Sequence, residues 1–124
     1  MPSDIPDDLR EFITQQIDSI AQLEALLLLR DNAPDAWSSD RIAARLYVDE
    51  GESARLLNDL HQKGFLNQSD AGFYFSCRTP ELETMVTRLA QLYRQMLIPV
   101  TNLIHSKQKR IQQFADAFRL RKES

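Results

Sequence analysis

The sequence predicts a mainly α-helical domain with one small β-hairpin, on three observations. Apolar residues recur at three- and four-residue spacing along most of the chain, which is the period of a helix buried on one face. Helix-capping residues stand at the start of several of these stretches. One pair of β-prone runs encloses a short turn near position 70. With 124 residues, 43% of them hydrophobic and 27% charged, the chain is predicted to form one compact domain over residues 1–124.

Two helices are expected in the first third of the chain. The first is predicted over residues 6–16, because Pro6 suits a first helical turn and the two acids after it favour a helix N-terminus. The second begins at Ser19, which has capping-box spacing to Gln22, and a turn containing proline ends it. Its apolar residues lie on nearly all sides, so we expect it to be the buried centre of the fold. Together the two helices form an extension over residues 6–31.

Two shorter helices follow in the middle of the chain. Either Ser38 or Ser39 caps the first of them. The second is predicted over residues 50–63, because Asp49 and Glu52 have capping-box spacing at its start. The apolar residues expected to bury these helices are Ile42, Ala43, Leu46, Leu56, Leu57 and Leu60.

A small hairpin completes the core motif, which we place at residues 38–76. Gly64 permits the chain to reverse at the end of the second short helix. The β-prone runs at 65–68 and 73–76 then enclose the turn at 69–72.

The remainder of the chain is predicted to be helical, as an extension over residues 80–121. Thr79 and Pro80 start a long helix with an apolar heptad seam, formed by Leu82, Met85, Leu89, Leu92 and Met96. Such a seam needs a partner helix, so we predict that it forms a homodimer together with the N-terminal helix. Pro99 is expected to kink or end the long helix, and a last helix is predicted over residues 107–122.

The core motif resembles the winged helix-turn-helix of bacterial regulators. The resemblance is carried by the segments 44–48 and 57–66, in which each residue type has a mechanical reason. The small side chain of Ala44 would let two helices cross closely, Val48 would fill the turn between them, and Gly64 would permit the reversal into the hairpin.

The complete succession, with two helices before the motif and two after it, is similar to the multiple-antibiotic-resistance regulator type. In that family the terminal helices form a dimer interface. The tail at 114–122 is also similar to the ending of a group of uncharacterised bacterial winged-helix proteins, a similarity that brings no known activity. The resemblance implies a dimeric, double-stranded-DNA-binding transcription regulator.

In DNA-binding members of this type, the second helix of the motif enters the major groove and the wing follows the backbone. The positions that match this pattern for base contacts in our sequence are Ser53, Arg55, Asn58 and Gln62. The positions that match it for phosphate contacts, at the start of the preceding helix, are Ser38, Ser39 and Arg41.

The charge of this surface favours a second hypothesis. The same helices carry Asp49, Glu50, Glu52 and Asp59, and the hairpin has Asp70 where a basic residue would be expected. Lysine and arginine provide most non-specific affinity for DNA, so an acidic surface should bind it weakly. Two function classes therefore stay open: a DNA-binding transcription regulator, and a winged-helix module that uses the same surface to bind protein without binding DNA.

Charge is also unevenly distributed along the chain. Residues 1–35 carry eight acids and two bases, for −6, whereas residues 80–124 carry four acids and eight bases, for +4. An acidic front and a basic tail indicate either attraction between subunits or a surface for polyanions. The basic residues of the tail are Lys107, Lys109, Arg110, Arg119, Arg121 and Lys122, for which solvated helix ends are the alternative interpretation.

Other function classes have no support in the sequence. His61 and His105 have no obvious catalytic partner, and with the single Cys77 they do not make a metal-ligand set, so we expect no enzyme, no metal and no cofactor. No basic leader opens the chain, and the strongest apolar run, 26–29, is far shorter than a membrane span. We therefore expect a cytoplasmic protein that does not associate with membranes.

Overall fold

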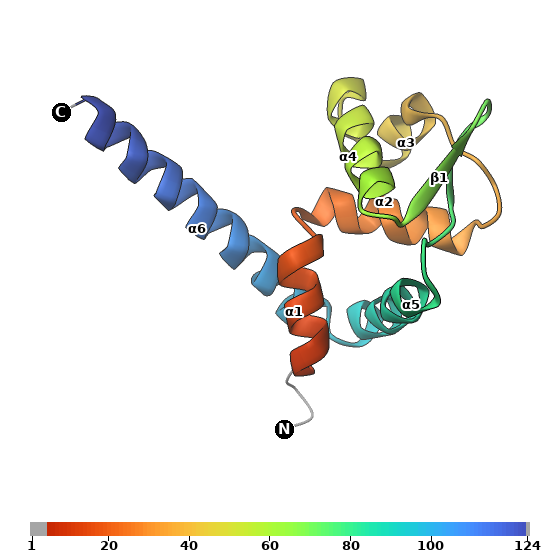
Figure 1. The fold of residues 1–124 in the computed structure, drawn as a ribbon, viewed down its shortest axis with the longest axis horizontal. Helices are drawn as coiled ribbons and strands as arrows, with labels where there is room; N and C mark the ends of the chain where they lie inside the picture. Colours follow the sequence, from red (N-terminus) through yellow and green to blue (C-terminus); the bar gives the residue numbers. More distant parts are fainter. Residues whose placement is uncertain (1–4, 124) are drawn as a thin grey trace.

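The computed structural model describes residues 5–123, with side chains up to residue 115. In this part of the chain, six helices and one antiparallel strand pair follow the order α1 (Asp7–Gln16), α2 (Ile20–Asp31), α3 (Ser39–Leu46), α4 (Glu50–Gln62), β1 (Leu66–Ser69), β2 (Gly72–Phe75), α5 (Pro80–Gln95) and α6 (Leu97–Glu123) (Figure 1). The prediction of a mainly helical fold with one small hairpin is confirmed. The side chains of the tail residues Phe118, Arg119, Arg121 and Lys122 lie outside the described residues.

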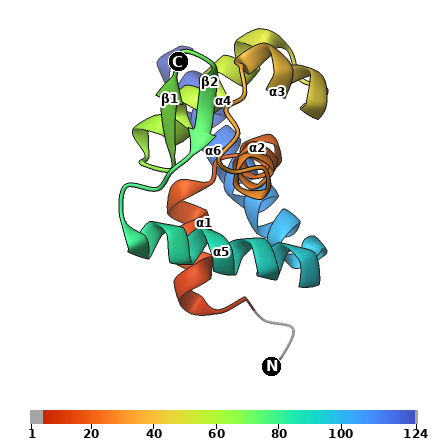
Figure 2. The same ribbon diagram turned by 90° about the vertical axis from the view of Figure 1, so that its right-hand side faces the viewer.

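Helices α1 and α2 begin and end close to where the sequence predicts. The Ser19 hydroxyl caps α2 by accepting a hydrogen bond from the backbone N–H of Gln22, at 3.1 Å. Helix α2 runs through the middle of the molecule and packs against α3, α4 and β2 (Figure 2). Its buried residues are Gln22, Leu23, Ala25, Leu26 and Leu29, which confirms its place at the centre of the core.

Helices α3 and α4 pack against each other across a three-residue turn, 47–49. Ser38 caps α3 and Asp49 caps α4, each by accepting a hydrogen bond from a backbone N–H three residues later. The buried small residue of α3 is Ala43, whereas Ala44 is exposed. The prediction that Ala44 allows the close helix crossing is therefore wrong, because one residue corresponds to about 100° around a helix.

The hairpin has a two-residue turn and an additional backbone partner. Strands β1 and β2 pair antiparallel, with Ser69 opposite Gly72. Trp37, just before α3, pairs with Phe73 through two backbone hydrogen bonds of 2.8 Å. Gly72 has a φ of +132°, and a Cβ at this position would overlap the carbonyl oxygen of Trp37. Only glycine therefore fits where the hairpin meets the Trp37 segment.

The apolar seam of α5 is covered by the same chain. Leu89 and Leu92 are buried in the core, and Leu82, Met85 and Met96 are partly buried against it. Helices α1 and α6 supply this cover, and Arg88 of α5 also forms an ion pair with Asp8 of α1. Much of the seam is therefore an intrachain contact, because heptad spacing shows that a face is buried without showing which helix covers it, and a homodimer through its partly exposed residues stays a prediction.

Helix α6 is longer than the sequence predicts. The break after α5 lies at Met96, which has a φ of −132° and a ψ of 52°, and α6 starts at Leu97. Pro99 therefore lies in the first turn of α6, where its missing N–H needs no partner. The predictions that Pro99 breaks the helix and that the last helix starts at residue 107 are wrong. The first part of α6 packs on α1 and α5, and the rest projects from the body (Figure 1).

One hydrophobic core joins all the helices and the hairpin. It extends from Ile5 at the start of the described chain to Ile104 in α6, and it includes Leu57 and Leu60 of α4. None of the helices over residues 5–123 is both long and apolar enough to cross a membrane.

Candidate interaction surface

Helix α3, helix α4 and the hairpin lie at one end of the molecule, opposite α5 (Figures 1 and 2). We name the outward-facing part of this end the head. It comprises the exposed or partly exposed residues Ser38, Ser39, Asp40, Arg41, Arg45, Tyr47, Asp49, Glu50, Glu52, Arg55, Asn58, Gln62, Ser69 and Asp70.

Helix α4 is oriented by its apolar face. Leu57 and Leu60 are completely buried, so the side chains at Arg55, Asn58 and Gln62 are exposed on the other side of the helix. Their spacing of three and four residues aligns them along one exposed face. The structure thus brings together three of the four residues that the sequence singles out for base contacts.

Ser53, the fourth of these residues, does not belong to the head. It is 0% exposed, and its hydroxyl donates a hydrogen bond to the backbone carbonyl of Ser39, at 2.8 Å. Its role is to join α4 to the start of α3, and it is not available for a base. The prediction of an exposed serine is wrong because a polar side chain at the crossing of two helices can be satisfied by a backbone group.

At the start of α3, the residues predicted to contact phosphate are partly engaged. The Ser38 hydroxyl caps the helix, and Ser39 is half-buried with its carbonyl bound to Ser53. Arg41 is exposed, and its guanidinium carbon lies 3.8 Å from the centre of the Trp37 ring. Arg41 is therefore held in place by stacking while its charge faces solvent.

Tyr47 is a feature of the head that sequence reasoning missed. It is 95% exposed, and its backbone is left-handed, with a φ of 58° and a ψ of 41°. A left-handed conformation costs a residue with a side chain about 1–2 kcal/mol. The signal in the sequence was the short connection between two capped helices, which forces a reversal at this position.

The head carries more negative than positive charge. Its acids are Asp40, Asp49, Glu50, Glu52 and Asp70, and its bases are Arg41, Arg45 and Arg55. Three of the acids surround the N-terminus of α4, where free backbone amides would otherwise favour an anion. The hairpin adds no compensating charge, because no lysine or arginine occurs between residues 65 and 77.

A network of charged side chains joins the C-terminal end of α4 to α2 and α6. Lys63 contacts Asp59 at 2.9 Å and Asp18 at 3.1 Å, and Lys107 of α6 contacts the other oxygen of Asp18 at 3.0 Å. The amide of Gln22 donates to Asp59 at 2.6 Å. Partial burial acts to raise the pKa of Asp18, but the hydrogen bonds and charges of the two lysines outweigh it and lower this pKa below its ordinary value.

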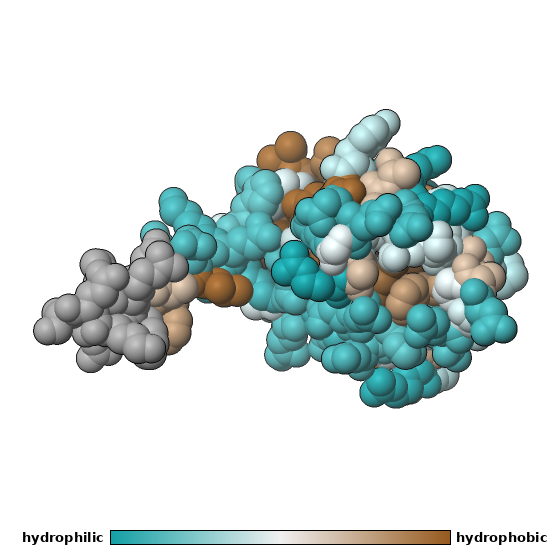
Figure 3. Space-filling view, turned by 90° about the horizontal axis from the view of Figure 1, so that it is seen from above, coloured by the Kyte–Doolittle hydropathy of each residue, from teal (hydrophilic) through white to brown (hydrophobic). Residues whose placement is uncertain are grey.

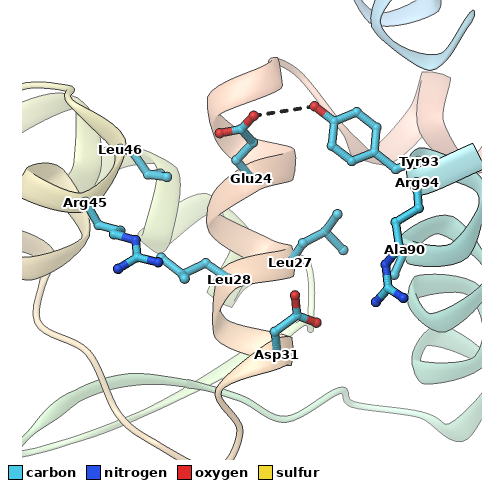
Figure 4. A pocket seen from close by; sticks show the side chains of 9 residues that line it. All are labelled: Glu24, Leu27, Leu28, Asp31, Arg45, Leu46, Ala90, Tyr93 and Arg94. Carbon is cyan, nitrogen blue, oxygen red and sulfur yellow. Dashed lines mark hydrogen bonds between the residues drawn. The ribbon is translucent and has the colours of Figure 1, made fainter. Parts of the chain in front are cut away.

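A groove lies beside the head, between α2, α3 and α5. Its volume is about 350 Å³, and Figure 4 shows Leu27 and Leu28 of α2 between Arg45 on one side and Arg94 on the other. The hydroxyl of Tyr93 donates a hydrogen bond of 3.4 Å to Glu24 at its edge. The groove has an apolar floor with charges of both signs around it.

Cys77 and His61 are each partly buried in the fold. Burial, with a smaller effect of Glu83, raises the pKa of the Cys77 thiol to about 11, so the thiol is protonated at neutral pH. His61 packs edge-on against Phe73, with ring centres 6.0 Å apart. Over the described residues, no group of three or more histidine, cysteine or acidic side chains is placed to hold a metal ion.

Comparisons of the chain with protein-family profiles, curated proteins and solved structures find no match. The geometry and charge of the head are therefore the basis for assigning a function.

Proposed function

We propose that this protein is a winged helix-turn-helix module whose head binds a basic surface of another protein. The order and packing of α3, α4 and the hairpin support the winged helix-turn-helix assignment. Helices α3 and α4 pack across a short turn, and the hairpin follows α4 directly. This is the order of elements in the winged form of the helix-turn-helix.

The net charge of the head supports a protein partner over DNA. Asp59 of α4 is paired with Lys63 and is not counted in the head. The head has three arginines and five carboxylates, which gives it a net charge of −2. Double-stranded DNA has about one negative charge per 1.7 Å of its axis, so it would be repelled by the acids around the start of α4. A basic protein surface would be attracted to the same acids.

The exposure of Tyr47 on the head is the strongest support for a protein partner. Tyrosine is enriched at the centre of protein interfaces, where it contributes a large rigid area and one hydrogen-bonding group. Here Tyr47 is almost fully exposed at a position whose backbone would suit glycine better, two and three residues before the exposed acids Asp49 and Glu50 in the chain. An exposed aromatic residue on an acidic surface fits an interface with a basic, partly apolar partner.

The test uses crosslinking in cell lysate to identify the bound protein, followed by titration of the purified partner with the purified chain. Tyr47→Ala should weaken this binding by about 30-fold or more, which is the effect of losing an interface hot spot. The double substitution Glu50→Gln and Glu52→Gln should also weaken it. Glu81→Gln, an exposed acid on α5, is the matched control and should leave the affinity unchanged.

A DNA-binding regulator is the second candidate, and the exposed row formed by Arg55, Asn58 and Gln62 favours it. These side chains are of the types that hydrogen-bond to base edges in the major groove. In this case Arg55→Ala should cost about 1–3 kcal/mol of binding energy, and the substitutions of Glu50 and Glu52 should strengthen non-specific binding at low salt. Specific DNA binding that survives physiological salt and is lost in Arg55→Ala would replace the protein-binding proposal.

A further inference from the structure

The face of α6 that is buried in the body continues onto the part of the helix that projects. Val100 and Ile104 are buried in the core, and the side chain of Lys107 is 15% exposed beside Asp18. Ile111 and Phe114 follow at the same four- and three-residue spacing, but they are 59% and 75% exposed. These residues form one stripe along α6, and the stripe has apolar residues beyond Lys107, where the helix leaves the body of the protein.

The projecting part, residues 109–123, is named the arm. At about 1.5 Å per residue it is about 22 Å long. Figure 3 shows apolar atoms on it between hydrophilic neighbours. Of the five large hydrophobic residues that are exposed in the described part of the chain, four lie on α6, and the arm holds Ile111 and Phe114. A helix of this length is only marginally stable in water without packing on its apolar face.

We propose that the apolar stripe of the arm, around Ile111 and Phe114, packs against a second copy of this chain. Charge complementarity supports this occupant. Lys109 and Arg110 lie exposed beside the stripe, and they are additional to the two bases of the segment 80–124, Arg88 and Lys107, that pair with Asp8 and Asp18 of the same chain. The exposed acids of the first segment, 1–35, also include Asp7 and Glu11 on α1, which these intrachain pairs do not use. A second copy presents this acidic face to the basic arm.

The exposed apolar pair of the arm, Ile111 and Phe114, favours a protein surface over a purely ionic ligand. A polyanion would pair with Lys109 and Arg110, but it would leave Phe114 in water. The proposed dimer interface lies on α6 and is separate from the head. The dimer proposal therefore holds whether the head binds protein or DNA.

Sedimentation equilibrium of the full chain from about 1 to about 100 µM tests the proposal, because dimer formation depends on protein concentration. We expect a dimer. Phe114→Asp should weaken it by about 100-fold or more, since the substituted ring occurs in both copies. Gln113→Asp is the matched control, because it adds the same charge to an exposed residue about 100° away around the helix. It should leave the dimer intact.

The folding of the variants and the role of charge are tested separately. Circular dichroism should show the same melting of the body in both variants, because neither residue belongs to the core. Replacing Lys109 and Arg110 with glutamate should weaken the dimer, as should raising the salt concentration. A wild-type monomer at about 100 µM would overturn the proposal, and so would a dimer unaffected by Phe114→Asp. A monomer that binds phosphatidylserine vesicles through Phe114 would also overturn it and assign the arm to lipid.

Discussion

Two glycine-to-alanine substitutions should change the stability of this protein in opposite directions. Gly72 has a φ of +132°, and an alanine Cβ there would lie 2.7 Å from the backbone nitrogen of Ser38 and closer still to the carbonyl of Trp37. The backbone strain costs about 1–3 kcal/mol. Losing the two hydrogen bonds between Trp37 and Phe73 costs about 0.5–1.5 kcal/mol each. Gly72→Ala should therefore destabilise the fold by about 2–6 kcal/mol in total.

Gly51 is the matched control for this substitution. It lies in the first turn of α4, and an added Cβ would meet only the Asp49 carboxylate, at an ordinary contact distance of 3.4 Å. Alanine restricts the unfolded chain more than glycine does, so Gly51→Ala should stabilise the protein by about 0.5 kcal/mol. Urea unfolding followed by circular dichroism measures both free energies. Equal effects of the two substitutions, or a Gly72→Ala variant as stable as the wild type, would refute the close approach of hairpin and Trp37 segment.

Three further predictions concern the core, the charge network and the thiol. Leu57→Ala and Leu60→Ala should each destabilise the fold by about 2–5 kcal/mol in the same unfolding assay, and losses near zero at both sites would mean that the face of α4 is misassigned. The lowered pKa of Asp18 stabilises the fold at neutral pH, and this contribution is lost as the pH falls below the ordinary value of 3.8. Asp18→Asn should therefore be less stable than the wild type at pH 7, and the two melting curves should converge in strong acid; a constant difference would contradict the network. Alkylation of Cys77 should be slow at neutral pH and should accelerate up to about pH 11, whereas a rate that levels off near pH 9 would show an ordinary thiol.

Local signals explain which features the sequence predicted. Ser19, Ser38 and Asp49 each cap a helix as expected, because a cap depends only on residues three positions away. The buried face of α4 was predicted for a similar reason, since Leu57 and Leu60 repeat with the period of the helix.

Long-range packing explains the features that the sequence did not predict. The burial of Ser53 depends on the carbonyl of Ser39, fourteen residues earlier in the chain. The cover of the α5 seam depends on α1, and the sharing of Asp18 by Lys63 and Lys107 depends on a contact across 89 positions. A period or a cap signal has no information about such partners, so the sequence could not show that α1 and α6 cover much of the α5 seam.

The stacking of Arg41 on Trp37 supplies the protein with its own optical reporter. Trp37 is the only tryptophan in the sequence, and its ring is 7% exposed beneath a guanidinium that belongs to the head. A ligand that displaces Arg41 would admit water to the indole and shift its fluorescence emission to longer wavelength. Occupancy of the head can therefore be followed by titration without a dye, a label or an engineered residue.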